Sequence, residues 1–199
     1  MKEHPVQDLS YLPQYGYGSR STAFWGTAGF MLIEGTGFAL AAGTYLYLAL
    51  VNQTWPLGAA PPGLLWSSLL TFVLVASVWM NQITKRHAEH EDLRLVRRDL
   101  VVMSVIGFVV LALRAMEFTT LGIRWDQNAY GSIVWVLLGL HTTHVLTDLG
   151  DTLVLTALMF TRHGRGKRFS DVSDNAVYWN FVVIAWLPIY ALIYFAPRL

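Results

Sequence analysis

The feature that most constrains this chain is the stretch of residues 130–160, which is apolar enough to cross a membrane yet carries four ionisable side chains. These side chains are His141, His144, Asp148 and Asp151. Because an α-helix turns by about 100° per residue, the four fall within an arc of about 80° on one helix face. Ionisable groups that face hydrocarbon cost several kcal/mol each, so this polar stripe must face protein or water.

Composition places the whole chain in a membrane. The 199 residues are 54% hydrophobic and only 14% charged, whereas soluble domains carry about 25% charged residues. The chain has no cysteine, which excludes disulfides, thiolate metal sites and iron–sulfur clusters. The polar residues 1–24 precede an apolar run that is longer than a signal-peptide core, so we expect no cleaved targeting segment.

Five apolar runs are long enough to cross about 30 Å of hydrocarbon. The runs are residues 25–51, 64–84, 99–119, 130–160 and 176–196. The sequence therefore predicts an all-α fold, in which residues 25–199 form one bundle of five transmembrane helices and residues 1–24 form a cytoplasmic tail.

The distribution of lysine and arginine predicts the orientation of this bundle. The N-terminal tail, the second connection and the fourth connection together hold eleven of the fourteen basic residues, and five spans place all three on one side. Basic residues are enriched on the cytoplasmic side of membrane proteins, so we expect the N-terminus inside and the C-terminus outside. We interpret the basic loops as topology determinants and contacts with anionic lipids, and not as a nucleic-acid site.

Depth along the helices predicts one contact inside the bundle. Glu34 lies about 14 Å along its helix from residue 25, and His141 lies about 16 Å from residue 130. In a core of about 30 Å both are near the midplane, so we expect Glu34 to approach His141 or His144. Asp148 continues the polar stripe toward the cytoplasmic side. Ionisable groups that follow one another in depth can pass protons, or they can serve only to bond helices together.

A second polar pair is expected in the third span. Arg114 and Glu117 are three residues apart, a spacing at which opposite charges can pair on one helix. We interpret this pair as structural.

The histidines offer poor ligands for a cofactor. A bis-histidine haem requires ligands from opposing faces, but His141 and His144 share one face and the other predicted spans contain no histidine. The remaining histidines lie outside the spans, at His4, His87, His90 and His163. We therefore predict no catalytic, cofactor or metal site in this chain, and interpret the polar residues as proton, lipid or structural sites.

Several motifs occur together in one order. They are FWGTAGFMLIEGTGFALAAGTYLYL around Glu34, RAMEF ending at Phe118, AYGSIVWVLLGLHTTHVLTD around the histidines, and VYWNFVVIAWLPIYALIYFAPR near the C-terminus. This series resembles subunit III of the haem–copper oxidases, the cytochrome c oxidase subunit 3 family, in its short five-helix bacterial form. In the last motif Asn180 and Val183 stand where the family usually has histidine and aspartate, which removes two ionisable groups.

The resemblance implies an accessory subunit without a redox centre. It implies that haem and copper lie in partner subunits I and II, which reduce O2 to water and pump protons. It also implies that this chain stabilises subunit I, holds phospholipid and supports proton uptake, in a bacterial cytoplasmic membrane. Two alternatives stay open: a subunit of a quinol oxidase or of a relative associated with nitric-oxide reductase, and an independent five-helix proton-linked transporter.

Overall fold

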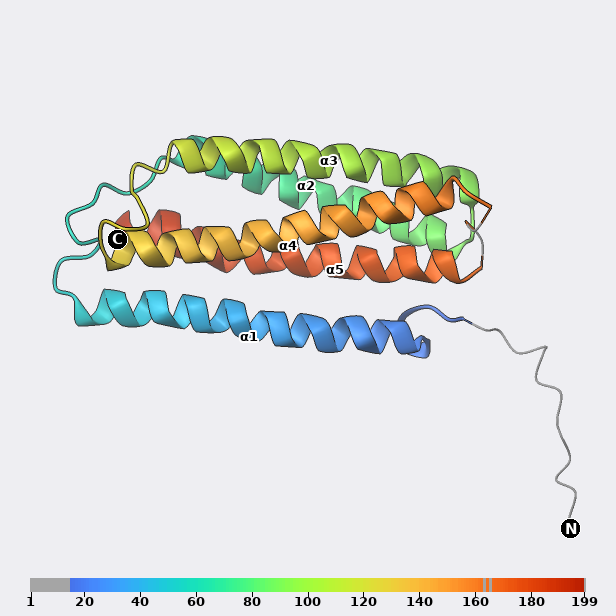
Figure 1. Ribbon diagram of the computed structural model, residues 1–199, viewed down its shortest axis with the longest axis horizontal. Helices are drawn as coiled ribbons and strands as arrows, with labels where there is room; N and C mark the ends of the chain where they lie inside the picture. The colour runs from blue at the N-terminus through green and yellow to red at the C-terminus, as the bar shows by residue number, and fades with distance from the viewer. Residues whose placement is uncertain (1–14, 163, 165, 199) are drawn as a thin grey trace, which may run out of the picture.

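A computed structural model describes residues 15–162, 164 and 166–198, and within these it shows an all-α protein of five long helices (Figure 1). The helices are α1 (Thr22–Val51), α2 (Leu64–Glu89), α3 (Leu93–Thr119), α4 (Ala129–Met159) and α5 (Lys167–Tyr190). The predicted all-α class is thereby confirmed. Residues 1–14 of the predicted tail lie outside the described residues, as do His4 and His163.

Short helical turns flank these helices. A 3₁₀ turn, η1 (Gly18–Arg20), precedes α1, and α5 continues through a π-helix, η2 (Ala191–Phe195), into a 3₁₀ turn, η3 (Ala196–Arg198). The π-helix follows Pro188, the only proline inside the five long helices that the structure describes. Because proline lacks a backbone N–H, the Ile184 carbonyl, four residues before it, loses its usual α-helical donor.

Four of the described helical segments are long and apolar enough to cross a membrane. They are α2, α3, α4 and the continuous segment Lys167–Arg198. α1 is not among these four segments. Its 30 residues would extend about 45 Å, but Glu34 and the many glycine, threonine and tyrosine residues of this helix lower its mean hydropathy.

Three helices extend beyond the apolar runs that predicted them by about five residues or more. α2 continues to Glu89, α3 begins at Leu93, and α5 begins at Lys167. Hydropathy marks only the apolar part of a helix, whereas capping decides where the helix begins. At the start of α3, the Asp92 carboxylate accepts hydrogen bonds from the backbone N–H groups of Arg94 and Leu95, at 3.1 and 3.2 Å.

The three basic segments lie at one end of the bundle, which we call the basic end. The α2–α3 turn and the α4–α5 turn meet there, and the segment before α1 starts beside them (Figure 1). The Tyr17 hydroxyl donates to the Glu91 carboxylate at 3.1 Å, and the Ser170 hydroxyl donates to the Gly16 carbonyl at 2.6 Å. Burial raises the pKa of Tyr17, so its hydroxyl stays protonated and continues to donate to Glu91. Within the described residues, these segments meet at one end of the bundle.

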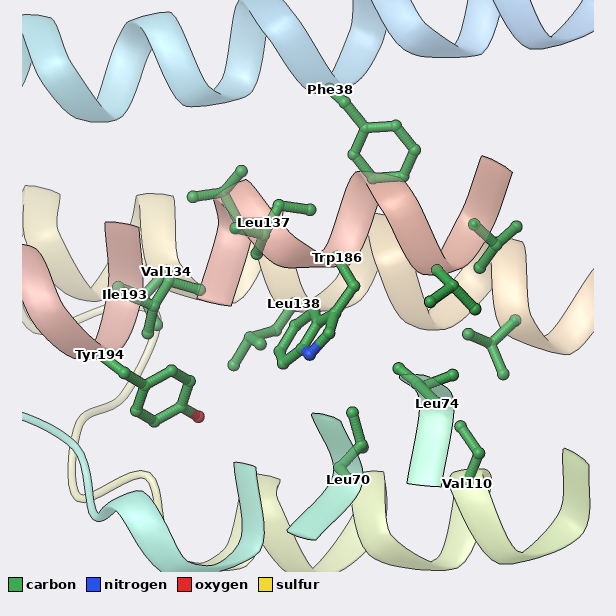
Figure 2. Close-up of a cluster of buried hydrophobic side chains, with 14 of the residues drawn as sticks. Phe38, Leu70, Leu74, Val110, Val134, Leu137, Leu138, Trp186, Ile193 and Tyr194 are labelled. Atoms are coloured by element: carbon green, nitrogen blue, oxygen red, sulfur yellow. The ribbon is translucent and has the colours of Figure 1, made fainter. Parts of the chain in front are cut away.

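The helices are arranged in three tiers. α4 and α5 lie in the middle, α2 and α3 cover one side of them, and α1 lies on the opposite side (Figure 1). Figure 2 shows Trp186 of α5 at the centre, between Leu138 of α4 and Leu70 and Leu74 of α2. The Trp186 indole N–H donates to the Thr71 hydroxyl at 2.7 Å, which satisfies its single polar atom.

α1 is the least embedded helix. Only Phe38 and Tyr45 on it are buried, and Figure 2 shows Phe38 pointing from α1 toward the middle tier. On its outer face, Leu40 and Leu50 are 72% and 85% exposed. α1 is therefore held by a few side chains, and its outer face is left to contact lipid or another protein.

Candidate functional site: the polar interior of the bundle

The first polar cluster is built around Arg114 of α3, whose side chain is 2% exposed. Arg114 Nη1 lies 2.5 Å from Glu117 Oε2, and Nη2 donates to His141 Nδ1 at 2.9 Å. The guanidinium also lies over the Trp186 ring, 4.1 Å from its centroid. The Tyr194 hydroxyl donates to the other oxygen of Glu117. The predicted pair of Arg114 and Glu117 is confirmed, and the cluster joins three helices.

The protonation of His141 follows from its two partners. Its Nδ1 accepts from Arg114, and its Nε2 lies 3.1 Å from the Val182 carbonyl oxygen. A guanidinium can only donate and a carbonyl can only accept, so His141 is neutral and carries its proton on Nε2. His141 therefore bridges α3, α4 and α5 as a hydrogen-bonding link.

The second polar cluster is built around Glu34 of α1. Glu34 Oε1 lies 3.2 Å from His144 Nε2, and the Tyr178 hydroxyl donates to Oε2 at 2.8 Å. The Phe38 ring covers His144, with 4.7 Å between the ring centroids. The prediction that Glu34 approaches one of the two histidines is confirmed, and the partner is His144.

The pair of Glu34 and His144 holds one proton between its facing atoms. His144 Nδ1 lies 2.6 Å from the Leu140 carbonyl oxygen, so Nδ1 carries a hydrogen and donates. If Nε2 and the Glu34 carboxylate were both unprotonated, two acceptors would face each other at 3.2 Å. One proton therefore lies on either His144 or Glu34, and the pair is neutral overall in both states.

The third polar group is Asp148, which is fully buried at 0% exposure. Its Oδ1 accepts from the Asn175 amide at 3.0 Å, while its Oδ2 has no partner within the described part of the chain. The Thr152 hydroxyl donates to the Asn175 side-chain oxygen at 3.2 Å. Asp151 is exposed, so the predicted polar stripe is divided among different environments.

The residues that sequence reasoning missed lie mostly on α5. Tyr178, Asn175 and Tyr194 each bond to an ionisable residue of the interior. They are uncharged, and the sequence does not show which face of α5 turns toward α1, α3 and α4. Their common signal is an uncharged side chain that can form a hydrogen bond and lies on or just after the last long helix.

The two departures from the resembled motif have separate environments. Asn180 accepts a hydrogen bond from the Asn81 amide at 3.0 Å, and Asn81 also donates to the Ala176 carbonyl at 2.7 Å. Val183 is 2% exposed and belongs to the hydrophobic core. Position 180 thus joins α5 to α2 through amides.

Metal ligands are not gathered in the structure. Within residues 15–162, 164 and 166–198, no three histidine, aspartate or glutamate side chains lie where they could hold a metal ion. The interior polar groups bond chiefly to one another and to the backbone.

The fold and the interior contacts together define a helical-bundle membrane protein in which most buried polar side chains bond to one another or to the backbone. Residues 50–197 match the family described as cytochrome c oxidase subunit III, and the chain belongs to this family. The match includes α2 to α5, with Arg114, Glu117, His141, His144 and Asp148, and it begins at the last turn of α1.

Curated relatives agree with this assignment. Cytochrome c oxidase subunit 3 of Thermostichus vulcanus is 24% identical over 172 residues, which cover 85% of each chain. The Synechocystis protein of the same name is 25% identical over 182 residues, covering 89% of this chain and 77% of the relative. The probable cytochrome c oxidase subunit 3 of Mycobacterium tuberculosis strain H37Rv is 28% identical over 155 residues, covering 74% of each.

Proposed function

We propose that this chain is the accessory, non-redox subunit III of a proton-pumping cytochrome c oxidase, which reduces O2 to water in aerobic electron transport. The observation that carries the proposal is the family match over residues 50–197. The haem and copper of such an enzyme belong to partner subunits I and II. In this chain Arg114 pairs with Glu117 and Glu34 pairs with His144, as expected of a subunit that supports a complex.

The proposed topology has five membrane spans, with α1 as the first. The basic end then lies in the cytoplasm of a bacterial cell, and the C-terminus lies outside the cytoplasmic membrane. In the sequence, eleven of the fourteen lysine and arginine residues belong to the N-terminal tail and to the second and fourth connections, which supports this orientation.

The proposed partners of the outer surface are subunit I and phospholipid. The exposed apolar face of α1, with Leu32, Ile33, Leu40 and Leu50, suits either a helix of subunit I or acyl chains. Both occupants are apolar at this depth, and both would complete the packing of a helix that the chain itself buries on one side only.

The interior residues divide between two proposed roles. Arg114, Glu117 and His141 bond α3, α4 and α5 together, and this role is structural. Glu34, His144 and Asp148 are the groups that can hold or exchange a proton within the bundle, and they are proposed to support proton uptake.

Purification in mild detergent tests the proposed function. We expect the chain to copurify with a large subunit and with visible absorption bands of haem a or haem o. Oxidation of reduced cytochrome c by the preparation would identify the electron donor, whereas oxidation of a quinol would favour a quinol oxidase. A stable, haem-free protein that copurifies with no other subunit and transports protons would overturn the proposal in favour of a transporter.

Replacing Glu34 with glutamine tests the proton role. The amide keeps the size of the side chain and can still accept from Tyr178, so stability should change by no more than about 2 kcal/mol, the upper value for hydrogen bonds within bilayers. The amide cannot take up the shared proton, so the oxidase should lose activity earlier during continuous turnover than the native enzyme.

The measurement is oxygen consumption followed over many turnovers. Asp126→Asn is a suitable control, because Asp126 lies on the outer loop and pairs only with Arg124 there. If the initial rate and its persistence are both unchanged in Glu34→Gln, the proton role of Glu34 is wrong.

A further inference from the structure

A polar pocket at the basic end lies between the segment that precedes α1 and the first turn of α5. Its volume is about 620 Å³, and small-molecule sites commonly enclose about 300 to 1,000 Å³. The described lining consists of residues 15–17, residues 20–23, Lys167 and Ser170. α1 and α5 both start at this end of the bundle (Figure 1). We call this space the basic-end pocket.

Contacts between the two walls fix the shape of the basic-end pocket. The Ser170 hydroxyl, in the first turn of α5, donates to the Gly16 carbonyl at 2.6 Å. Tyr15 packs against the residue that precedes α5, because a Cβ added to Gly166 would lie 3.5 Å from Tyr15 Cε1. The segment before α1 is thereby held against the start of α5, and the pocket is a built part of the fold.

The described lining carries two cations and no acid. Arg20 and Lys167 are exposed, and neither forms an ion pair or a side-chain hydrogen bond with a residue that the structure describes. Glu91 is close to the pocket but outside its lining, and it accepts hydrogen bonds from the hydroxyls of Tyr15 and Tyr17, each at 3.1 Å. The two positive charges of the lining therefore have no counter-charge within the pocket walls described.

Two long helices begin at the basic-end pocket. α1 has 30 residues and α5 has 24, and the first N–H groups of a helix have no acceptor within the helix itself. The N-cap residues are Ser21 and Gly166, and neither supplies a side-chain hydrogen bond to these N–H groups. Since the helix dipole places partial positive charge at the N-terminus, both helix ends favour an anion.

The Ser21 hydroxyl is an independent sign of a ligand. Ser21 is 9% exposed and lines the pocket, yet its hydroxyl has no hydrogen-bond partner among the described residues. A serine at an N-cap normally accepts from the second or third N–H of its helix, and a buried polar group without a partner is costly. An anion in the pocket would accept from this hydroxyl and from the free N–H groups together.

We propose that the basic-end pocket binds a phosphate group. The phosphate oxygens accept hydrogen bonds from the Ser21 hydroxyl and from the N–H groups that start α1 and α5, and Arg20 and Lys167 balance the charge. The described lining contains no leucine, isoleucine, valine or methionine, which favours inorganic phosphate or a water-soluble phosphate ester over a lipid headgroup. The site belongs to this chain alone, so it does not depend on the function proposed above.

Equilibrium dialysis with radiolabelled inorganic phosphate tests the site. The sample is the full chain, with whatever subunits copurify, in dodecyl maltoside micelles, which contain no phosphate. We expect the native protein to bind phosphate, and the double variant Arg20→Gln with Lys167→Gln to bind it about tenfold or more weakly, because two charge-assisted contacts are lost.

The variant Ser21→Asp separates binding from folding. It places a carboxylate where the phosphate would lie, so phosphate binding should be lost. Aspartate is also a favourable N-cap residue, so the thermal midpoint of the protein should stay the same or rise. A loss of binding without a loss of stability is therefore the expected result.

The double variant Arg86→Gln with Arg94→Gln is the matched control. It removes two exposed charges from the α2–α3 end of the bundle, outside the pocket lining, and should bind phosphate like the native protein. Added phosphatidylglycerol distinguishes the two sources of phosphate, since displacement of the bound label assigns the site to a lipid headgroup and retention assigns it to a soluble phosphate. Absence of phosphate binding to the native protein, native affinity in either pocket variant, or an equal loss in the control would overturn the proposal.

Discussion

Replacing Arg114 with alanine is expected to destabilise the bundle by about 3 to 5 kcal/mol, the cost of removing one partner from a buried ion pair. The substitution leaves the Glu117 carboxylate, which is 2% exposed, without its counter-charge. It also removes the donor that His141 Nδ1 faces at 2.9 Å and the cation that lies over the Trp186 ring. Three helices lose a shared anchor through this one change.

The measurement is the free energy of unfolding in mixed micelles, or the thermal midpoint of the purified complex. Arg114→Lys keeps the charge but lacks the planar guanidinium that reaches Glu117 and His141 together. Its loss of stability should therefore be intermediate. Arg124→Ala breaks the exposed pair with Asp126 and should change stability little, because exposed ion pairs contribute little. Equal effects of Arg114→Ala and Arg124→Ala would show that the buried cluster does not stabilise the bundle.

Replacing Gly131 with alanine is expected to destabilise the protein by about 3 kcal/mol, the upper range for overpacking. A Cβ at this position would lie 2.2 Å from the Arg124 carbonyl oxygen and 3.1 Å from Ile123 Cγ1. The obstacle is backbone, so it cannot move aside as a side chain could. The loop is also fixed there, because the Trp135 indole N–H donates to the Ile123 carbonyl at 2.8 Å.

Gly139→Ala on the same helix is the matched control, and its effect should have the opposite sign. A Cβ there meets no atom within 4 Å, and alanine is favoured over glycine in a helix by about 1 kcal/mol. Thermal unfolding of the two variants beside the native protein decides the matter. If Gly131→Ala is as stable as Gly139→Ala, the close approach of the loop to α4 is wrong.

The contacts that could be predicted are those that depend on helix geometry alone. The spacing of three residues brings Arg114 to Glu117, and the rise per residue places Glu34 at the depth of the histidines. Apolar runs also located five helices, although three of these helices continue past the runs, because capping and hydrogen bonding set their ends.

The contacts that escaped prediction depend on how each helix is rotated about its own axis. His141 and His144 share one face of α4, and either could have been the partner of Glu34; the structure assigns them to separate clusters, one with Arg114 and one with Glu34. The rotation of α4 about its own axis decides which histidine faces α1 and which faces α3, and apolar composition does not fix such a rotation. For the same reason the sequence did not identify Tyr178 as the hydroxyl partner of Glu34.

The position of α1 has a consequence for how the protein is made. α1 packs on α4 and α5, so this helix is synthesised well before the helices that it contacts. The Tyr178 partner of Glu34 follows it by 144 residues, which is about 7 to 29 s at 5 to 20 residues per second. Until α5 is made, Glu34 has only His144 of the two partners that it bonds in the complete bundle. A chain that stops before α5 therefore lacks the hydroxyl that satisfies the second carboxylate oxygen of Glu34.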